Sequence, residues 1–280
     1  FSFKDLGVDL FPKTDYPVNP NPSYVALGDL NGDGRTDVVV TSWATGSTFV
    51  SVMLGTPAGT LGPRSDVSVT GTSYTIALAD YNGDSKLDLA TPNTNVNSVS
   101  VRLGNGDGTF GPITDYPLGA GALWLTAADL NNDGKLDLVA SNVTANTLSV
   151  LMGNGNGTFA PKVDYATDVS PVNVAVGDVD GDGIPDLVSE NSGAGTNSVS
   201  VLIGTGTGTF GAKTDIGAGA HPQSVAVRDL NADGKPDLVV GNAGDNTVSV
   251  LLGNGDGTFG ARTDFGTGDL PQSVVLGDLN

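Results

Sequence analysis

The sequence has 280 residues, no cysteine, one histidine and a net charge of −19 at neutral pH. Its 12 Lys and Arg residues form no basic stripe, which excludes a protein that binds nucleic acid through the backbone phosphates. No apolar run is long enough to span a bilayer. Hydrophobic residues make up 38% of the chain, enough to bury a core, and the absence of Cys means only that no disulfide is needed.

An acidic loop of nine residues recurs along the chain. Its first Asp falls at positions 29, 80, 129, 178 and 229, and a sixth copy begins at position 278. One such Asp-, Asn- and Gly-rich stretch could equally be an ordinary β-turn, but five copies in fixed register favour a metal cage. The acidic residues support this choice, since all except Glu190 are Asp, whereas a merely soluble surface would use both types.

The spacing of oxygen atoms in this loop suits a hard cation. Side-chain oxygens at positions 1, 3, 5 and 9, with a backbone carbonyl at position 7, predict a Ca²⁺ cage, because Ca²⁺ takes six to eight oxygens in irregular geometry. The predicted ligands, the fourth of each full set through its carbonyl, are Asp29, Asn31, Asp33, Arg35 and Asp37; Asp80, Asn82, Asp84, Lys86 and Asp88; Asp129, Asn131, Asp133, Lys135 and Asp137; Asp178, Asp180, Asp182, Ile184 and Asp186; Asp229, Asn231, Asp233, Lys235 and Asp237; and, in the sixth copy, Asp278 and Asn280.

The loop departs from an EF-hand after its ninth position. An EF-hand needs Glu at position 12, and none of the five copies has one there. Short apolar runs follow instead, so the loop is predicted to join two strands. Position 6 is expected at positive φ, which Gly accepts freely. Ser85 replaces that Gly and predicts the weakest site, whereas Asp180 adds a charge and predicts the tightest.

In chain order, units of about fifty residues each predict four short strands. In the last complete unit these are 224–227 and 238–240 around the acidic loop, then 247–252, a Gly-rich turn and 261–265. The complete repeats are approximately 24–74, 75–122, 123–172, 173–222 and 223–272, which we expect to form a single domain. Residues 13–16 align with a fourth strand and 273–276 with a first strand, so segments 1–23 and 273–280 predict one split blade.

These residues resemble the FG-GAP or VCBS repeats of integrin-α-like β-propellers, from about Phe11 onward. The resemblance implies an all-β propeller of four-stranded antiparallel blades, with five complete repeats plus one split blade and six or seven blades in the intact ring. It also implies about one structural Ca²⁺ per complete repeat, held between the first and second strands. Ligands of similar propellers bind on the opposite loop face or between blades.

That opposite face is predicted to carry the loops 42–48, 92–97, 141–146, 191–197 and 242–246, which are rich in Asn, Thr and Gly. Trp43 and Trp124 fall in or near it, where they could stack on a sugar, although filling gaps between blades is the favoured interpretation. His221 is interpreted as a loop residue. No catalytic set stands out, so the sequence predicts that the protein is not an enzyme.

The sequence therefore predicts a secreted or cell-surface, Ca²⁺-stabilised module for binding, adhesion or structure. Low-affinity Ca²⁺ cages, with Kd values of about 10⁻⁴–10⁻³ M, are typical of extracellular modules. Three alternatives remain at this point: a carbohydrate-binding lectin, a self-assembling filament or surface-layer subunit, and an accessory domain of a secreted enzyme. The expected partners are a protein or glycan on the loop face opposite the Ca²⁺ loops, and a second copy joined through the incomplete terminal blade.

Overall fold

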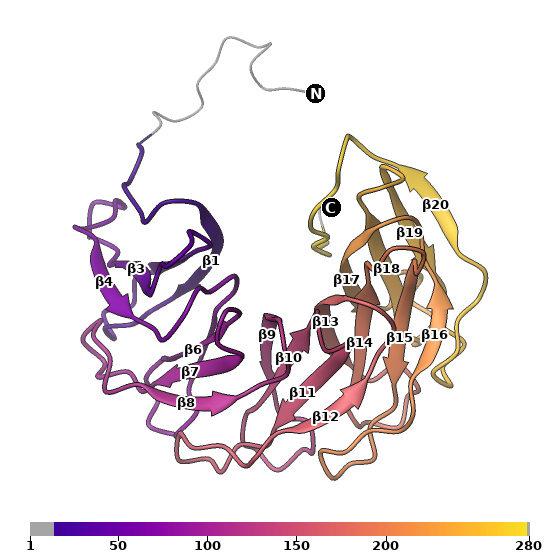
Figure 1. The fold of residues 1–280 in the computed structure, drawn as a ribbon, viewed down its shortest axis with the longest axis horizontal. Coiled ribbons are helices and arrows are strands. Elements are labelled where there is room, and N and C mark those ends of the chain that lie inside the picture. Colours follow the sequence, from indigo (N-terminus) through magenta and orange to yellow (C-terminus); the bar gives the residue numbers. More distant parts are fainter. Residues whose placement is uncertain (1–13, 279–280) are drawn as a thin grey trace.

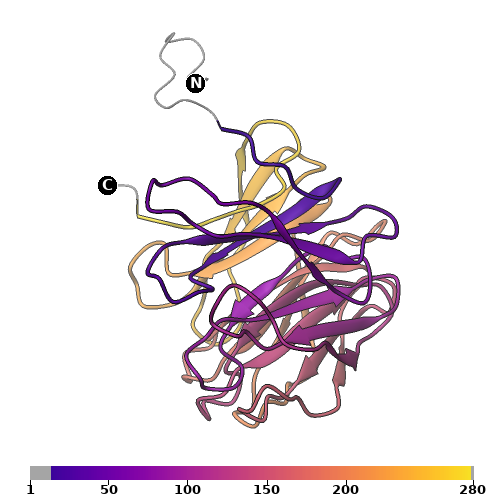
Figure 2. The same ribbon diagram turned by 90° about the vertical axis from the view of Figure 1, so that its left-hand side faces the viewer.

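The computed structural model describes residues 14–278, which form five four-stranded antiparallel sheets and no helix. The sheets are arranged around a common axis as an open arc, and the first and last sheets flank the opening (Figure 1). Turned by 90°, they cross the view at successive angles, as blades around an axis do (Figure 2). The predicted all-β propeller architecture is therefore confirmed.

In every sheet the strands pair in sequence order, so each sheet is a simple meander, and we number the sheets blades 1 to 5 along the chain. The strands are, in blade 1, β1 (Pro22–Gly28), β2 (Asp37–Ser42), β3 (Phe49–Met53) and β4 (Ser65–Ser68); in blade 2, β5 (Ala77–Ala79), β6 (Asp88–Asn93), β7 (Ser98–Arg102) and β8 (Thr114–Pro117); in blade 3, β9 (Ala122–Ala128), β10 (Asp137–Asn142), β11 (Thr147–Leu151) and β12 (Val163–Ala166); in blade 4, β13 (Pro171–Gly177), β14 (Asp186–Asn191), β15 (Ser198–Leu202) and β16 (Thr214–Gly217); and in blade 5, β17 (Pro222–Arg228), β18 (Asp237–Asn242), β19 (Thr247–Leu251) and β20 (Thr263–Gly266).

The order of strands from the axis outward explains their composition. First strands such as β9, β13 and β17 lie toward the centre of the arc, and fourth strands such as β12 and β16 form its rim (Figure 1). The second strands β6, β10, β14 and β18 are buried along their whole length. A strand covered on both faces reads as a nearly continuous apolar run, which is why the residues after each acidic loop do not alternate strictly.

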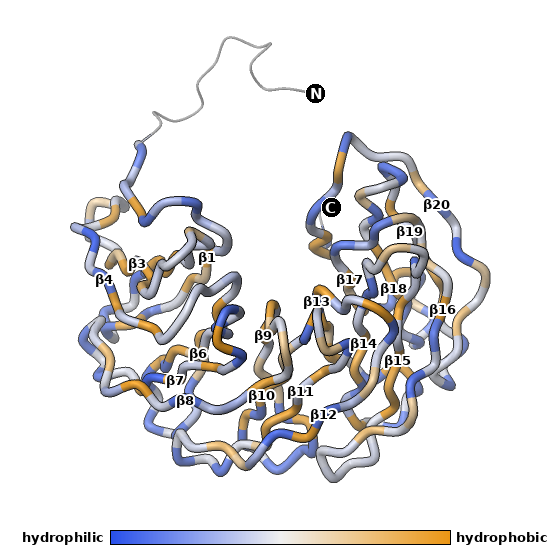
Figure 3. The backbone as a smooth tube through the Cα atoms, viewed as in Figure 1, coloured by the Kyte–Doolittle hydropathy of each residue, from blue (hydrophilic) through white to orange (hydrophobic). Residues whose placement is uncertain are grey.

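The hydrophobic core is divided among the contacts between successive blades. Four clusters of buried residues lie there, one for each neighbouring pair of blades. The hydropathy colouring shows the apolar residues in the middle strands and hydrophilic residues in the loops (Figure 3). A single blade cannot cover both faces of its own sheet, so stacking supplies its stability.

At each contact one long apolar side chain covers a glycine in a turn of the following blade. The pairs are Leu54 on Gly108, Leu103 on Gly157, Met152 on Gly208 and Ile203 on Gly257. A Cβ added to Gly108 would come within 2.8 Å of Cδ2 of Leu54, and Gly108 has a φ of 82°. The left-handed backbone conformation favours glycine here, and a Cβ would also force the Leu54 side chain of the preceding blade to shift.

The two ends of the arc expose residues whose counterparts inside it are buried or partly buried. Val25 in β1 is 53% exposed, whereas Ile76, at the same place in the second repeat, is 4% exposed. At the other end Leu252, the counterpart of Leu54, is 47% exposed. Self-association through the incomplete terminal blade, which the sequence predicts, stays a prediction.

The predicted split blade is not formed by the described parts of the terminal segments. Residues 14–21 and 267–278 contain no strand, and residues 1–13 and 279–280 lie outside the described residues. The hydroxyl of Tyr16 nevertheless accepts the N–H of Leu61 at 3.1 Å, as Tyr116 accepts that of Phe159 at 3.3 Å. Tyr16 is thus placed as the alignment predicts, but with no adjacent strand the backbone has no ladder to join.

Candidate metal-binding loops

The five acidic loops connect the first and second strands of their blades, where the sequence places them, and share one internal geometry. The carboxylate at position 1 accepts several backbone N–H groups of its own loop. In blade 1, Asp29 accepts those of Asn31 at 3.3 Å, Asp33 at 3.1 Å and Gly34 at 2.7 Å. The hydrogen bond from Gly34 leads the causes that lower the pKa of Asp29, so this carboxylate is held in its charged form.

Positions 3 and 5 continue the same pattern of side-chain-to-backbone bonds. Oδ1 of Asn31 accepts the N–H of Asp33 at 3.1 Å, and Oδ1 of Asp33 accepts that of Arg35 at 2.9 Å. Asn and Asp suit these positions, because their short side chains readily reach a backbone N–H two residues further on. The loop therefore gathers its oxygen atoms through its own hydrogen bonds.

The backbone of each loop passes twice through the left-handed region, at positions 4 and 6. Position 6 has φ of 77° at Gly34 and 64° at Ser85, which confirms the positive φ predicted there. Position 4 was not predicted, yet it has φ of 57° at Asn132 and 61° at Ala232. An L-residue with a Cβ costs roughly 1–2 kcal/mol in this conformation, so Ser85 and Ala232 are strained.

We expect Ser85→Gly to stabilise the protein by about 0.5–1 kcal/mol, because relief of the left-handed strain exceeds the extra entropy that Gly gains on unfolding. Urea unfolding in the presence of a chelator measures the change without a metal contribution. The matched control is Gly34→Ser at the same position of blade 1, which should lose a similar amount. If both variants moved the midpoint in the same direction, the strain assignment would be wrong.

The Asp at position 9 ties the loop to the rest of its blade. In blade 3, Oδ2 of Asp137 accepts the N–H of Leu130 at 2.9 Å and Oδ1 accepts that of Gly153 at 2.7 Å. The same pair of bonds recurs in the other four blades. These five Asp residues are buried, and burial raises the pKa of Asp137 and of Asp88.

The glycine that donates to this Asp is fixed by a close backbone approach. A Cβ at Gly153 would lie 2.1 Å from the carbonyl oxygen of Leu136, and one at Gly104 would lie 2.2 Å from that of Leu87. Backbone atoms cannot move aside as a flexible side chain does. The residue that opens each Gly-rich turn must therefore be glycine in order to donate its N–H to the Asp at position 9 of the acidic loop.

Charge balance distinguishes the loop of blade 4 from the others. In blades 1 to 3, the basic residue at position 7 pairs with the Asp at position 5: Arg35 with Asp33, Lys86 with Asp84 at 3.8 Å, and Lys135 with Asp133 at 3.2 Å. Blade 4 has Ile184 at position 7 and carries a fourth carboxylate, Asp180, at position 3. Its loop therefore collects more negative charge and supplies no cation of its own.

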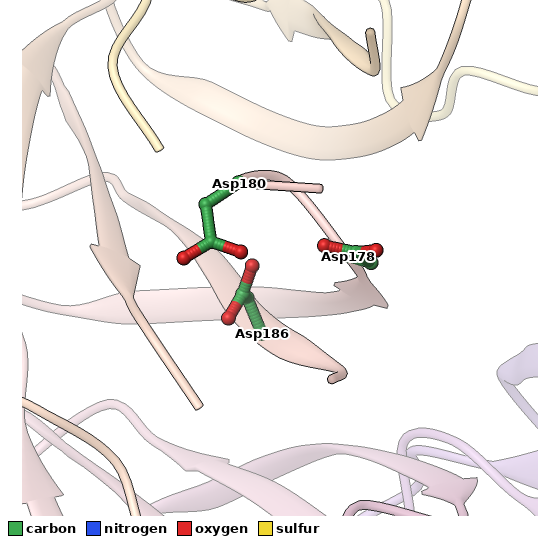
Figure 4. A group of neighbouring side chains, drawn as sticks. All are labelled: Asp178, Asp180 and Asp186. Atoms are coloured by element: carbon green, nitrogen blue, oxygen red, sulfur yellow. The ribbon is translucent and has the colours of Figure 1, made fainter. Parts of the chain in front are cut away.

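Asp178, Asp180 and Asp186 lie so close that one oxygen from each falls within 4.8 Å of the others (Figure 4). Burial raises the pKa of Asp186 to about 6, and the charges of Asp180 and Asp178 add to the effect. Burial also raises the pKa of Asp180, with Asp182 and Asp178 contributing. Among the described residues this is the one group of three carboxylates so arranged, and either a bound cation or a retained proton would relieve the repulsion between them.

The sixth predicted loop takes no such shape in the described residues. Asp278 lies beside Arg228, Asp229 and Leu230 of blade 5, and Asn280 lies outside the described part of the chain. The predicted carbonyl ligands at position 7 all lie within the five loops described above. The sequence did not predict a role for the side chains at position 7, but that of Arg35 forms an ion pair with Asp33 at position 5.

A polar ladder that the sequence did not predict, buried at its Asn and Ser members and exposed at its Asp, crosses strands 2, 3 and 4 of each of blades 2 to 5. In blade 3, Asn142 donates from Nδ2 to Ser149 Oγ at 2.8 Å, and Ser149 donates to Asp164 Oδ1 at 2.7 Å. The equivalent bonds recur in blades 2, 4 and 5. The Asn, Ser and Asp columns recur at the spacing of the acidic loops, which is the signal that could have revealed the ladder.

On the opposite loop face, Trp43 lies in the 42–48 loop at 41% exposure and packs edge-to-face on Tyr74, with ring centroids 5.3 Å apart. It lines a shallow pocket with Thr45, Thr94 and Asn95. Trp124 is half-buried and meets Tyr24 at a centroid distance of 5.4 Å. His221 occupies a left-handed turn with φ of 48°, in agreement with its interpretation as a loop residue.

Fold and loops together define a β-propeller in which every blade carries the same acidic turn. The chain belongs to the FG-GAP-like repeat family, whose pattern matches residues 29–91, 80–140, 129–189, 191–240 and 229–280. No curated protein sequence matches it. The described residues also contain no helix that is both long and apolar enough to cross a membrane.

Solved structures resemble this chain at low sequence identity. They include a protein from Lactobacillus plantarum (TM-score 0.67, 17% identity, 90% of this chain and 73% of that one) and the periplasmic gluconolactonase of Pseudomonas aeruginosa (0.62, 18%, 86% and 69%). A third is an Agrocybe aegerita lectin described as recognising non-reducing terminal N-acetylglucosamine (0.61, 22%, 88% and 66%). The chain thus spans about two thirds of that lectin's length. At these identities the likeness shows the fold alone.

Proposed function

We propose that this protein is a Ca²⁺-stabilised, non-catalytic binding module that works outside the cytoplasm. The observation that carries the proposal is the acidic loop of blade 4, where Asp178, Asp180 and Asp186 converge within 4.8 Å and the loop offers no basic side chain. Carboxylate and amide oxygens with backbone carbonyls are the donors that Ca²⁺ prefers. When bound, the ion would neutralise these carboxylates and join both ends of each loop.

The proposed location follows from the kind of site. Ca²⁺ sites made of short acidic turns bind with Kd values of about 10⁻⁴–10⁻³ M in extracellular modules. Cytosolic Ca²⁺ would leave such sites empty. A net charge of −19, much of it in the five loops, likewise favours a compartment with abundant divalent cations.

The non-catalytic role rests on how the candidate groups are used. The Asp side chains at positions 1 and 9 are engaged by backbone N–H groups, as in Asp29 and Asp137. The backbone of His221 forms part of a turn. Its N–H donates to Asn197 Oδ1 at 3.1 Å, and its carbonyl accepts the N–H of Ala243 at 3.0 Å. Hydrolysis of a glycoside needs an acid–base pair of carboxyl groups in different environments. The loops contain such carboxyl groups, as in Asp80 with a lowered pKa and Asp88 with a raised pKa, but backbone N–H groups engage both.

Chelation is the experiment that tests this proposal. With Ca²⁺ at one to ten times Kd, five sites contribute about 2–7 kcal/mol, so excess EDTA should lower Tm by roughly 5–20 °C. Readdition of CaCl₂ should restore the transition, and equimolar MgCl₂ should restore it less well, because Mg²⁺ demands a tighter octahedron. A melting curve that is unchanged by EDTA would contradict the metal role of the loops.

Glycan binding on the loop face is the second candidate function. It is favoured by the exposed indole of Trp43 beside Thr45, Thr94 and Asn95, since an aromatic face with neighbouring hydroxyl and amide groups suits a sugar. In Trp124→Phe the only indole is Trp43, so titration of neutral monosaccharides against its emission tests this pocket, and the absence of any saturable change would contradict glycan binding there.

A further inference from the structure

The acidic loops of blades 3 and 4 are joined by a hydrogen bond from a side chain to the backbone. Nδ2 of Asn132, at position 4 of the blade 3 loop, donates to the carbonyl of Gly183, at position 6 of the blade 4 loop, at 3.0 Å. We propose that this bond couples the two metal sites, so that filling either one raises the affinity of the other for Ca²⁺. The proposal rests on the metal role proposed above and adds communication between two of its sites.

The bond is particular to this junction between blades. Position 4 is glycine in blades 1, 2 and 4, and glycine has no side chain that could reach the next loop. At three junctions a turn glycine donates its N–H to the carbonyl at position 2 of the preceding loop, as Gly108 does to Leu30 at 3.1 Å. Within residues 14–278, the junction of blades 3 and 4 is the one without this backbone bond. Asn132 therefore supplies there a contact that the other junctions make elsewhere.

The acceptor lies where it can influence metal binding. The peptide unit that contains the Gly183 carbonyl also contains the N–H of Ile184, which donates to Oδ1 of Asp182 at 2.8 Å. Hydrogen bonds at the two ends of one peptide unit polarise it and strengthen each other. The carbonyl of Ile184 follows directly and is a predicted ligand. Asn132 therefore restrains the segment that carries two of the predicted donors, Asp182 and Ile184.

The loop of blade 4 has fewer internal bonds than its neighbour. Asp178 accepts two N–H groups of its own loop, from Gly181 at 2.7 Å and from Gly183 at 2.8 Å. Asp129, the equivalent residue of blade 3, accepts three. A loop with fewer internal bonds has more freedom to lose when a cation binds, and a restraint that is already in place reduces this cost. The bond from Asn132 is such a restraint.

Coupling in the opposite direction follows from the place of Asn132 in its own loop. It lies between Asn131 and Asp133, two predicted ligands of blade 3, and its φ of 57° is one that Asn adopts more readily than most residues with a Cβ. An ion in blade 3 would fix this backbone and hold Nδ2 toward Gly183. Linkage requires each site to change the affinity of the other by the same factor. For one exposed hydrogen bond we expect a factor of about two to five.

The amide of Ile184 reports on the blade 4 site separately from the other sites. The chain has five isoleucines, so ¹⁵N-isoleucine labelling gives five amide signals, and Ile184→Val identifies the required one. In a CaCl₂ titration, the midpoint of the Ile184 signal should rise about two- to fivefold in both Asn132→Gly and Asn132→Ala. These variants differ in backbone strain, but both lack the amide. Ala232→Gly, at the same position of blade 5, is the matched control and should leave the midpoint unchanged.

Asp129→Ala removes a predicted ligand of blade 3. It should raise the Ile184 midpoint by a similar factor when Asn132 is present and have no further effect in Asn132→Gly, which makes a double-mutant cycle. In excess EDTA, Asn132→Gly should also speed hydrogen exchange of the Ile184 amide about two- to fivefold, which checks the bond without metal.

Equal Ile184 midpoints in the wild type and Asn132→Gly, or equal effects of Asp129→Ala in both backgrounds, would overturn the coupling alone. A rise in only one of Asn132→Gly and Asn132→Ala would assign the effect to backbone strain and would overturn it too. An Ile184 signal that does not respond to CaCl₂ would overturn the coupling together with the metal role of the blade 4 loop. The EDTA melt tests the metal role of the other loops separately.

Discussion

Asp137→Ala should destabilise the protein by about 2–5 kcal/mol even when no metal is bound. The substitution leaves the buried N–H groups of Leu130 and Gly153 without their acceptor, and each buried unsatisfied group costs about 1–3 kcal/mol. The Gly153 N–H cannot find another partner by moving, because the backbone of Leu136 already lies against this glycine. Chemical denaturation in excess EDTA measures the loss.

Asp133→Ala in the same loop is the matched control. Asp133 is exposed, and it accepts the N–H and Nζ of Lys135 at 2.9 and 3.2 Å. A solvent-exposed pair of this kind is worth about 0–1 kcal/mol, so the metal-free control should lose little. In CaCl₂ both variants should also lose the contribution of the blade 3 site. Equal losses in EDTA would mean that position 9 acts only through the metal.

This comparison explains why the sequence predicted the loops so well. The same residues that provide oxygen donors also hold the loop through backbone hydrogen bonds, as Asp29 and Asn31 do. The pattern therefore reports a local conformation that needs no distant partner. The strand order was also predictable from the five repeats, because each blade has the same meander and the same set of apolar positions.

What the sequence could not provide depends on contacts between elements far apart in the chain. The strand expected at 273–276 is not formed in the described residues, because strand pairing needs a partner that local pattern does not supply. The grouping of residues from several repeats near the axis could not be predicted for a similar reason. Tyr24, Trp124 and Ser224 are separated by about two repeats each, and only the curvature of the arc brings them to one place.

The contacts between blades also explain why single polar residues matter in this fold. Each interior blade is covered on both faces, so a polar side chain on a second strand is buried among backbone groups of its neighbour. Thr41 Oγ1 donates to the carbonyl of Tyr74 at 2.9 Å, and Ser141 Oγ donates to that of Val172 at 2.7 Å. In blades 1 and 3 a small hydroxyl residue at this position thereby links the blade to the next one.

Glu190 holds that position in β14, and it is the residue for which we expect the strongest dependence of stability on pH. It is fully buried, and neither carboxyl oxygen has a hydrogen-bond partner among the described residues. Burial raises its pKa to about 8, compared with about 4.3 in an unfolded chain. Between these values the folded protein keeps a proton that the unfolded chain has released.

The free energy of unfolding therefore falls as pH rises from about 4.3 to about 8, by up to about 1.4 kcal/mol per pH unit, and this contribution is constant above that window. Glu190→Gln removes the titration. We expect the variant to match the wild type at about pH 3.5, where Glu190 is neutral in both the folded and the unfolded chain, and to exceed it by about 3–5 kcal/mol at pH 8.5. Glu190→Ser, which copies Ser141, should show the same loss of pH dependence. Urea titrations across this range in saturating CaCl₂ isolate the effect as a difference between proteins. Parallel pH profiles for all three would show that Glu190 is not held neutral.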